Sequence, residues 1–219
     1  TVRAVATAGA LVEVGGSGYI PEGDFTVAGA PLPESSPIRA VVAHILRAAA
    51  LVNDATLASD EGHWRVQGDP TEGALIVAAR KFGIAEDELA RYPRIAEIPF
   101  TSERKRHTTV HIDRENGAEV RVFQKGAPEI LIEKCRYVWE DGKAVPLGQD
   151  RRADFARRND ALAGQALRTL AVATRNVPAA SLGLGPRAGT ANLPTKIELP
   201  DSIEDDLILL GLVGMIDPP

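Results

Sequence analysis

The amino-acid sequence predicts an α+β domain in which an antiparallel β-sheet is flanked by helices. Strand-like segments follow one another with hairpin connections, and Asn116-Gly117 between two alternating runs is the strongest of these signals. Helical segments cluster between the strands instead of alternating with them one by one. The length of 219 residues suits either one large domain or one domain with short appendages, and the sequence has no internal repeat.

The first quarter of the chain predicts two strands and one helix. Residues 2–14 alternate loosely and are rich in Val and Ala, which is typical of a strand. A Gly- and Pro-rich turn region then leads into a short strand at residues 25–27. Residues 38–52 follow a Ser-Pro start and carry apolar side chains at helical spacing, so they predict a helix.

The motif GDPTEGAL, residues 68–75, begins the second predicted helix. Asp69 is a good N-cap, a proline follows at the first helical position, and Glu72 stands three residues later as in a capping box. Apolar residues continue on one face as far as Phe82, and Gly83 ends the helix.

The remaining segments predict a short helical turn, five further strands and two further helices. The turn covers the stretch EDELARY. The strands are expected at residues 94–100, 106–113, 119–126, 168–176 and 207–217, and the helices at residues 128–135 and 151–166. Residues 178–201 are rich in Gly, Pro and Ala without a clear period, so we expect a long, mobile loop there.

Composition and missing motifs argue against several classes of function. The net charge of −5 and the pI near 5.5 disfavour nucleic-acid binding, which needs a basic face. The sequence contains no P-loop, no GxGxxG and no GxSxG, and its one Cys and four His are too scattered for zinc. Cys135 is expected to be a small buried hydrophobe in a reducing compartment. The acid-rich stretches AEDEL and SIEDD are expected on solvated faces.

Membrane insertion and secretion find no support in the sequence. The longest apolar run, residues 207–216, is about half the length needed to span a bilayer. The first residues lack the charged and apolar regions of a signal peptide. The missing initiator Met indicates a segment excised from a longer chain.

The motif PFTSERKR combines an aromatic residue with cations. Phe100 stands at a predicted strand end, and Arg104, Lys105 and Arg106 follow it. On the residues alone, Phe100 is either a core aromatic or a ligand contact. For Arg104 and Arg106 a solvated face is the favoured interpretation.

The motif KGAPE places a lysine beside a helix start. Lys125 leaves a predicted strand, Gly126 permits close backbone approach, and Pro128 begins a helix. The preceding Ala127 is a poor cap, so either water or an anion satisfies the first amides of that helix.

Together, GDPTEGAL, PFTSERKR and KGAPE resemble the motifs of the nucleotide-binding domain of P-type cation-transporting ATPases, in the type II group of calcium and sodium/potassium pumps. ALRTLAVATR resembles a later strand of that domain, and TVRAV and GMIDPP resemble its connections to the phosphorylation domain. The matches follow the family's order and cover nearly the whole chain. The resemblance implies an N-terminal hinge-side strand at 1–14, a nucleotide-binding domain at 15–207 and a C-terminal hinge strand at 208–219.

The resemblance also implies contacts to the base of ATP. Phe100 would stack on adenine, and Leu170 would give it an apolar contact. Glu72 would accept a hydrogen bond from the adenine amino group and repel the carbonyl of guanine, although its capping-box role stays open. Thr71 would add a nearby hydroxyl.

The resemblance also implies three cations in the pocket, of which two meet the phosphates. Lys125 would lie deep in the pocket, and Lys105 and Arg168 would meet the phosphate chain. Gly126 would keep the pocket floor free of a side chain. Three positions depart from the family pattern. Thr101 stands where Ser is usual, Ser102 stands where several members carry Arg, and His107 stands where Met is frequent.

The function implied is that of the ATP-binding cytosolic domain of an integral plasma-membrane cation pump, which uses Mg-ATP. Its partners would be the phosphorylation and actuator domains of the same parent chain, with no nucleic acid, no direct membrane contact and a monomeric state. The chain has no DKTG motif, so we expect it to bind ATP without forming an aspartyl-phosphate or turning over. No catalytic or metal-binding residue is assigned, and Asp217 is expected at the hinge.

Two other functions stay open on the sequence. One is a non-catalytic interaction module that keeps this fold without using nucleotide. The other is a free-standing soluble hydrolase.

Overall fold

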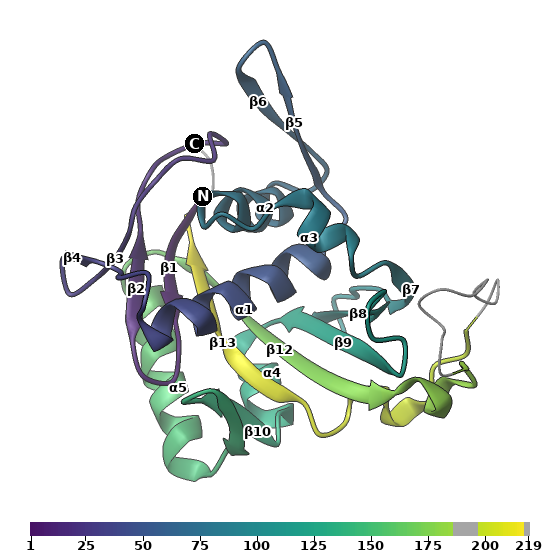
Figure 1. Cartoon of the computed structure of the whole chain (residues 1–219). Helices are drawn as coiled ribbons and strands as arrows, with labels where there is room; N and C mark the ends of the chain where they lie inside the picture. The colour runs from purple at the N-terminus through teal and green to yellow at the C-terminus, as the bar shows by residue number, and fades with distance from the viewer. Residues whose placement is uncertain (186–196, 217–219) are drawn as a thin grey trace.

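The computed structural model describes residues 1–185 and 197–216. Helices cover both faces of one large, almost wholly antiparallel sheet (Figure 1). The predicted α+β class, an antiparallel sheet flanked by helices, is therefore confirmed.

Within the described residues, eleven strands form the main sheet, in the order β4-β3-β2-β1-β13-β12-β9-β8-β7, with β10 beside β13 and β11 beside β10. A separate hairpin, β5–β6, projects from the body (Figure 1). The strands are β1 (Val2–Ala6), β2 (Leu11–Val14), β3 (Phe25–Val27), β4 (Ala30–Pro31), β5 (Thr56–Asp60), β6 (His63–Gln67), β7 (Arg94–Ile98), β8 (Arg106–Ile112), β9 (Glu119–Gly126), β10 (Tyr137–Glu140), β11 (Lys143–Pro146), β12 (Arg168–Pro178) and β13 (Ile208–Met215).

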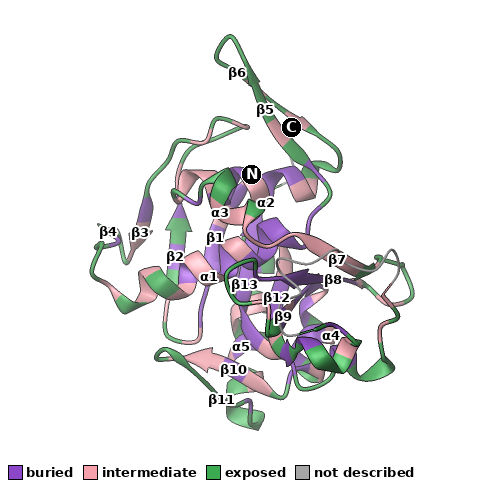
Figure 2. Cartoon of the chain, turned by 45° about the vertical axis from the view of Figure 1, so that its right-hand side comes forward, coloured by how far each residue is buried: buried purple, intermediate pink, exposed green. Residues whose placement is uncertain are grey.

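Two hydrophobic cores fill the spaces on either side of the sheet, as the buried segments in Figure 2 show. One core packs against helices α1 (Pro37–Leu51), α2 (Pro70–Lys81) and α3 (Glu86–Ala90). The other packs against helices α4 (Pro128–Lys134) and α5 (Gln149–Ala163). Cys135 lies fully buried in this second core, as predicted, and burial raises the pKa of its thiol to about 12.

The prediction of one strand over residues 2–14 is wrong. The chain folds back on itself at Thr7, whose amide donates to the carbonyl of Ala10 at 2.8 Å and whose hydroxyl accepts from the Ala10 amide at 3.0 Å. The result is an antiparallel hairpin of β1 and β2. The side-chain alternation of the two strands continues across this short turn, which conceals the reversal in the sequence.

Three short hairpin elements escaped the sequence analysis. The pair β10–β11 turns at Asp141-Gly142, which is a strong hairpin signal, and β5–β6 turns at Glu61-Gly62. The two-residue strand β4 is too short to give a pattern.

The predicted loop at residues 178–201 contains regular structure at both ends. One 3₁₀ turn covers Ala179–Leu182, and another begins with the last residue of this range and covers Asp201–Glu204. The central part, residues 186–196, lies outside the described residues, as does Asp217.

The two ends of the described chain lie side by side. The amino group of Thr1 donates to the carbonyl of Ile216 at 2.8 Å, and the Ile216 amide donates back at 2.9 Å. Strands β1 and β13 continue this antiparallel pairing into the sheet.

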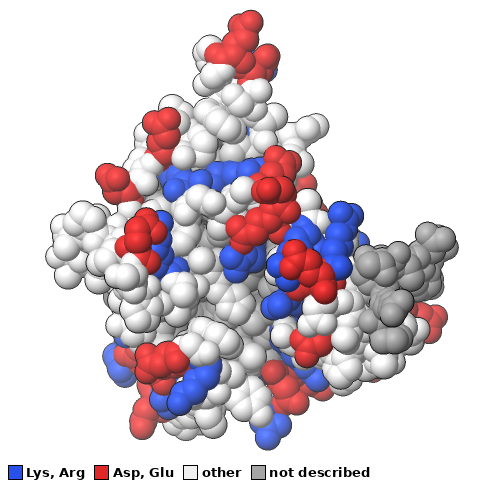
Figure 3. Space-filling view, viewed as in Figure 1, with Lys and Arg blue, Asp and Glu red and all other residues white. Residues whose placement is uncertain are grey.

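Acidic and basic side chains alternate over the visible face instead of forming a field of one sign (Figure 3). Ion pairs such as Arg80–Glu86 contribute to this pattern. None of the described helices has the length and apolar character needed to cross a membrane.

Gly211 in β13 allows close packing between the sheet and α1. A Cβ atom there would lie 2.3 Å from the carbonyl oxygen of Ala6 and 2.7 Å from the side chain of Ile45. We expect Gly211→Ala to lower the free energy of unfolding by about 1–3 kcal/mol, because backbone must move to relieve the overlap. Urea unfolding measures the loss, and Gly9→Ala, where no atom lies within 4 Å, is the matched control. Equal midpoints for the two variants would contradict this prediction.

Buried histidines predict loss of stability in acid. Burial lowers the pKa of His111 to about 4, and the ring contacts Tyr92 O at 2.7 Å and Thr109 Oγ1 at 2.9 Å. An unfolded histidine takes up its proton near pH 6.5, so the unfolded state binds more protons between pH 6.5 and 4, and stability falls as the pH drops through this window. The expected loss by pH 4 is on the order of 3 kcal/mol.

Urea unfolding at several pH values between 7 and 4 tests this expectation. His111→Gln should flatten the decline of stability with acidity, and His63→Gln on the exposed β6 should leave it unchanged. A decline of the same slope in His111→Gln would refute the assignment.

Candidate functional site

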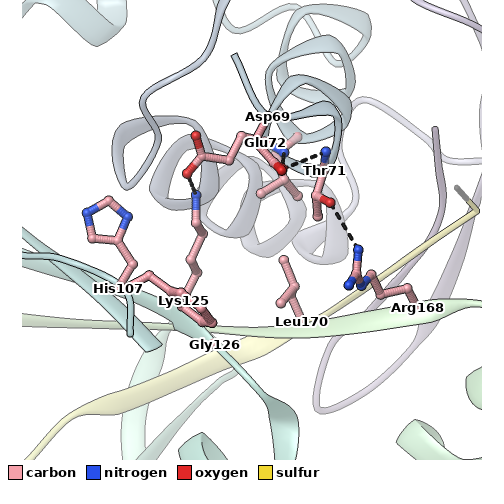
Figure 4. Close-up of a pocket in the computed structure, with 10 residues that line it drawn as sticks. Asp69, Thr71, Glu72, His107, Lys125, Gly126, Arg168 and Leu170 are labelled. Carbon is pink, nitrogen blue, oxygen red and sulfur yellow. Dashed lines mark hydrogen bonds and ion pairs between the residues drawn. The ribbon is translucent and has the colours of Figure 1, made fainter. Parts of the chain in front are cut away.

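A cavity of about 410 Å³ lies between the start of α2 and the sheet (Figure 4). This volume is within the range of small-molecule sites. The lining side chains come from α2 and the residue before it, from the segment after β7, and from strands β8, β9 and β12: Asp69, Thr71, Glu72, Leu75, Phe100, His107, Lys125, Gly126, Arg168 and Leu170.

The first turn of α2 is capped as the sequence predicts. Asp69 Oδ1 accepts from the amides of Thr71 at 2.8 Å and Glu72 at 3.1 Å. Glu72 does not complete a capping box. Its carboxylate instead accepts from the Asp54 amide at 3.1 Å and from Lys125 Nζ at 2.6 Å, so the side chain points away from the helix start and toward the sheet (Figure 4).

The ion pair of Lys125 and Glu72 closes one end of the cavity. Their side chains are 9% and 16% exposed, so neither charge is fully hydrated. Burial lowers the pKa of Lys125, and the hydrogen bond and charge of Glu72 oppose that shift. A lysine held in this way keeps a cation at the cavity wall where an anionic ligand group can meet it.

His107 stands beside Lys125 and is buried on β8 (Figure 4). Burial and the neighbouring lysine charge lower the pKa of His107, and its Nε2 lies 3.5 Å from a carboxylate oxygen of Glu97. A potential ligand atom of His107 lies within 4.8 Å of those of Asp54 and Glu72. Both carboxylates already face protein cations, because Arg94 donates to Asp54 at 2.6 Å and Lys125 donates to Glu72.

Phe100 is 58% exposed although it lines the cavity. Strand β7 ends at Ile98, so the ring follows the strand by two residues. Of the two alternatives that the sequence left open, the core aromatic is excluded. The ring therefore presents an apolar surface to the cavity that no protein side chain covers completely.

The opposite end of the cavity contains the second cation. Arg168 at the start of β12 donates from Nη1 to Thr71 Oγ1 at 3.3 Å, which joins the sheet to α2 (Figure 4). Leu170, two residues along the same strand, is half-buried and lies between the two cations in Figure 4.

Lys105 is the one predicted site residue that does not line the cavity. Its backbone has a φ of +52°, and its exposed side chain lies 3.7 Å from Glu129. Gly126 does line the cavity, and the structure adds a packing reason for this glycine. A Cβ atom there would lie 2.6 Å from the carbonyl oxygen of Lys105 and 2.7 Å from Cβ of Arg106.

The expectation of a solvated face for Arg104 and Arg106 is wrong. Both form ion pairs with Glu204, which is 6% exposed although it belongs to the acid-rich stretch SIEDD. Burial alone raises the pKa of Glu204, but hydrogen bonds from Thr108 and the two arginines outweigh it and hold the pKa below its ordinary value. The pairing joins segments about a hundred residues apart, which no local pattern reveals.

The structure thus brings seven of the eight predicted residues to one cavity. Sequence reasoning did not assign Asp69, Leu75 and His107 to it. Leu75 shares the face of α2 that points to the sheet, which the helical spacing of the GDPTEGAL motif could have indicated. His107 follows Arg106 directly on β8, so the two side chains point to opposite faces of the sheet. Which residues surround His107 depends on how β8 pairs with β9, and a local pattern does not give that pairing.

A family model described as "P-type ATPase, cytoplasmic domain N" matches residues 41–219. The chain belongs to this family.

Curated relatives agree with this assignment. The chain is 35% identical over its whole length to a protein of Bacillus subtilis named "Calcium-transporting ATPase", of which it covers 23%. It is 37% identical over 80% of its length to "Calcium-transporting ATPase 1" of Lactococcus lactis, covering 18% of that protein. It is 34% identical over its whole length to "Probable cation-transporting ATPase F" of Mycobacterium tuberculosis, covering 22%. The chain therefore spans about a fifth of the length of these relatives.

A prediction follows for the buried ion pair. Lys125→Met leaves the Glu72 carboxylate without its cation, and we expect a loss of about 2–4 kcal/mol in the free energy of unfolding. Lys125→Met combined with Glu72→Gln removes both charges and should cost less than the sum of the single losses. Urea unfolding of the wild type, both single variants and the double variant measures this coupling, and strict additivity would contradict it.

Proposed function

We propose that this chain binds ATP in the cavity and forms the nucleotide-binding part of a cation-transporting ATPase. The single observation that carries the proposal is the exposed Phe100 ring, which shares one cavity with the cations of Lys125 and Arg168. A purine nucleotide combines a flat apolar base with an anionic tail, and this combination matches an aromatic plate with cations on either side.

Contacts to the base follow from three side chains. The base stacks on Phe100, and Leu170 touches it from the sheet. Glu72 selects adenine, since its carboxylate accepts from an amino group and repels a carbonyl. The carboxylate has about four lone-pair sites and uses two for Asp54 and Lys125, so an acceptor site stays available.

Contacts to the phosphates come from the cations. Arg168 offers a fork to the phosphates next to the Thr71 hydroxyl, whereas Lys125 lies beside Glu72 at the other, buried end of the cavity, next to the base. Lys105 lies beside this cavity on a turn and reaches an extended phosphate chain only by leaving Glu129.

In the intact pump, the domain presents Mg-ATP to an aspartate of the phosphorylation domain, and the actuator domain completes the cycle. Transfer then depends on positioning and charge. The paired β1 and β13 form the connection to the phosphorylation domain. Support for this role comes from the family of the chain and from the adjacency of Thr1 and Ile216. The cation transported is set by parts of the parent protein other than this chain.

An ATP titration followed by amide shifts in NMR spectra tests the proposal. One stacked base and a few exposed ionic contacts give a binding free energy of roughly −4 to −6 kcal/mol, or a Kd of about millimolar to tens of micromolar. Phe100→Ala should raise the Kd by about tenfold, because stacking contributes roughly 1–3 kcal/mol. Phe82→Ala is the matched control, since this aromatic packs on Phe25 outside the cavity.

Two further measurements define the outcome. GTP should bind more weakly than ATP, and Glu72→Gln should reduce the difference. Unchanged spectra at high millimolar ATP would overturn the proposal in favour of an interaction module. Sustained phosphate release by the purified chain would favour a free-standing hydrolase.

A further inference from the structure

A carboxylate outside the cavity is connected to the segment that carries Phe100. This segment, residues 99–105, is called the Phe100 turn. Within the turn, the Thr101 carbonyl accepts from the Lys105 amide at 2.8 Å, and the Thr101 hydroxyl accepts from the Arg104 amide at 3.1 Å. These contacts fix the shape of the turn but do not fix its place relative to the sheet.

One backbone hydrogen bond attaches the end of the turn to the residue before α4. The Lys105 carbonyl accepts from the Ala127 amide at 3.0 Å, and the absence of a side chain at Gly126 leaves room for this approach. The first half of the turn, which includes Phe100, has no such backbone contact among those that the described residues make. Its position depends on the end of β7, where Ile98 pairs with Thr108 of β8, and on Arg104.

Arg104 reaches back across the turn. Its Nη1 donates to the carbonyl of Pro99, the residue before Phe100, at 3.0 Å. Its Nη2 donates to Glu204. The guanidinium therefore connects the backbone at the base of the Phe100 ring to a buried carboxylate.

Glu204 holds a second arginine in the same way. Arg106 donates to Glu204 Oε2 from Nη2 at 2.9 Å and from Nε at 3.2 Å, and its Nη1 donates to the Arg104 carbonyl at 3.2 Å. The carboxylate is also bound by Thr108 at 2.5 Å and by Gln124 Nε2 at 2.9 Å. Both of these side chains are buried in the sheet, so Glu204 has a rigid base.

One anion thus faces two cations. If Glu204 were neutral, the guanidinium groups of Arg104 and Arg106 would repel each other without compensation, and solvent would be the better place for one of them. Arg104 is the more exposed of the two, and its release would free the Pro99 carbonyl. The Phe100 ring would then lose its fixed position.

We propose that Glu204 is a positioning residue for nucleotide binding, which acts through Arg104 to hold the Phe100 turn against the sheet. The proposal rests on the proposed function of the cavity. It assigns Arg104 and Arg106 to the support of the aromatic contact. It also makes the 3₁₀ turn at Asp201–Glu204 part of the site, although none of its residues lines the cavity.

The test compares Glu204→Gln with a matched control at the other end of β8. Asp113 is 2% exposed and accepts two bonds from Arg91, at 2.8 and 2.9 Å, but it lies away from the Phe100 turn. Asp113→Asn therefore removes a comparable buried charge from an arginine. Urea unfolding of both variants records their stability, and ATP titration by NMR records their Kd.

We expect Glu204→Gln to raise the Kd for ATP by about three- to tenfold and to shift the amide signals of residues 100–105 in the absence of nucleotide. Asp113→Asn should leave the Kd within about twofold of the wild type while losing comparable stability. In a Phe100→Ala background, Glu204→Gln should have less than about a twofold effect, because the ring that it positions is missing.

A second variant covers the case in which Glu204→Gln does not fold. Arg104→Lys keeps a cation opposite Glu204, but one ammonium group does not span both the carboxylate and the Pro99 carbonyl. We expect the same loss of affinity, again only when Phe100 is present. Lys134→Ala, at the C-terminal end of α4, is the control for loss of a basic side chain outside the turn and should not change the Kd.

The outcomes separate the two proposals. Absence of ATP binding by the wild type overturns the proposed function of the cavity. ATP binding by the wild type with an unchanged Kd in Glu204→Gln and Arg104→Lys overturns the positioning role alone. Equal losses in the presence and absence of Phe100 also overturn it, because they indicate a general loss of structure.

Discussion

The contact between Lys125 and Glu72 joins the helical layer to the sheet across the edge of a cavity. Each charge is partly removed from water, so each depends on the other for compensation. Asn53 strengthens the same junction, because its side-chain amide donates to the Glu72 carbonyl at 2.9 Å. The start of α2 is therefore fixed relative to β9, and the space between them stays open instead of collapsing.

Two kinds of side chain surround the space, and they are held by different means. Leu75 and Leu170 belong to regular elements, whose positions follow from the packing of the core. Phe100 belongs to a turn, and its position follows from hydrogen bonds to charged groups behind the turn. Placing an exposed aromatic ring costs conformational entropy, so a turn of this kind needs such support. Rigid elements and a braced turn together form a preorganised surface.

Patterns within a few residues made the fold class predictable, and the resemblance of three motifs to a known family supplied most of the cavity residues. Asp69 and Pro70 mark a helix start, and the helical spacing after them identifies the buried face of α2. The same approach failed for Glu204, since the residues that bury it are Arg104, Arg106, Thr108 and Gln124, about 80 to 100 positions away. Lys105 does not line the cavity, and the sequence could not indicate this, since it gives the order of cations but not the direction of a side chain on a turn with positive φ. Short strands such as β4 are fixed by their neighbours and leave no pattern of their own.

Because Thr1 and Ile216 are adjacent, the chain could in principle be joined there and opened at another point. A short linker between these two ends and a new opening at the Glu61-Gly62 turn of the projecting β5–β6 hairpin would give a circular permutant with every sheet pairing intact. We expect the fold to tolerate such a change in chain connectivity, because the sheet is held by pairing between strands and does not require the strands to follow one another in this order along the chain.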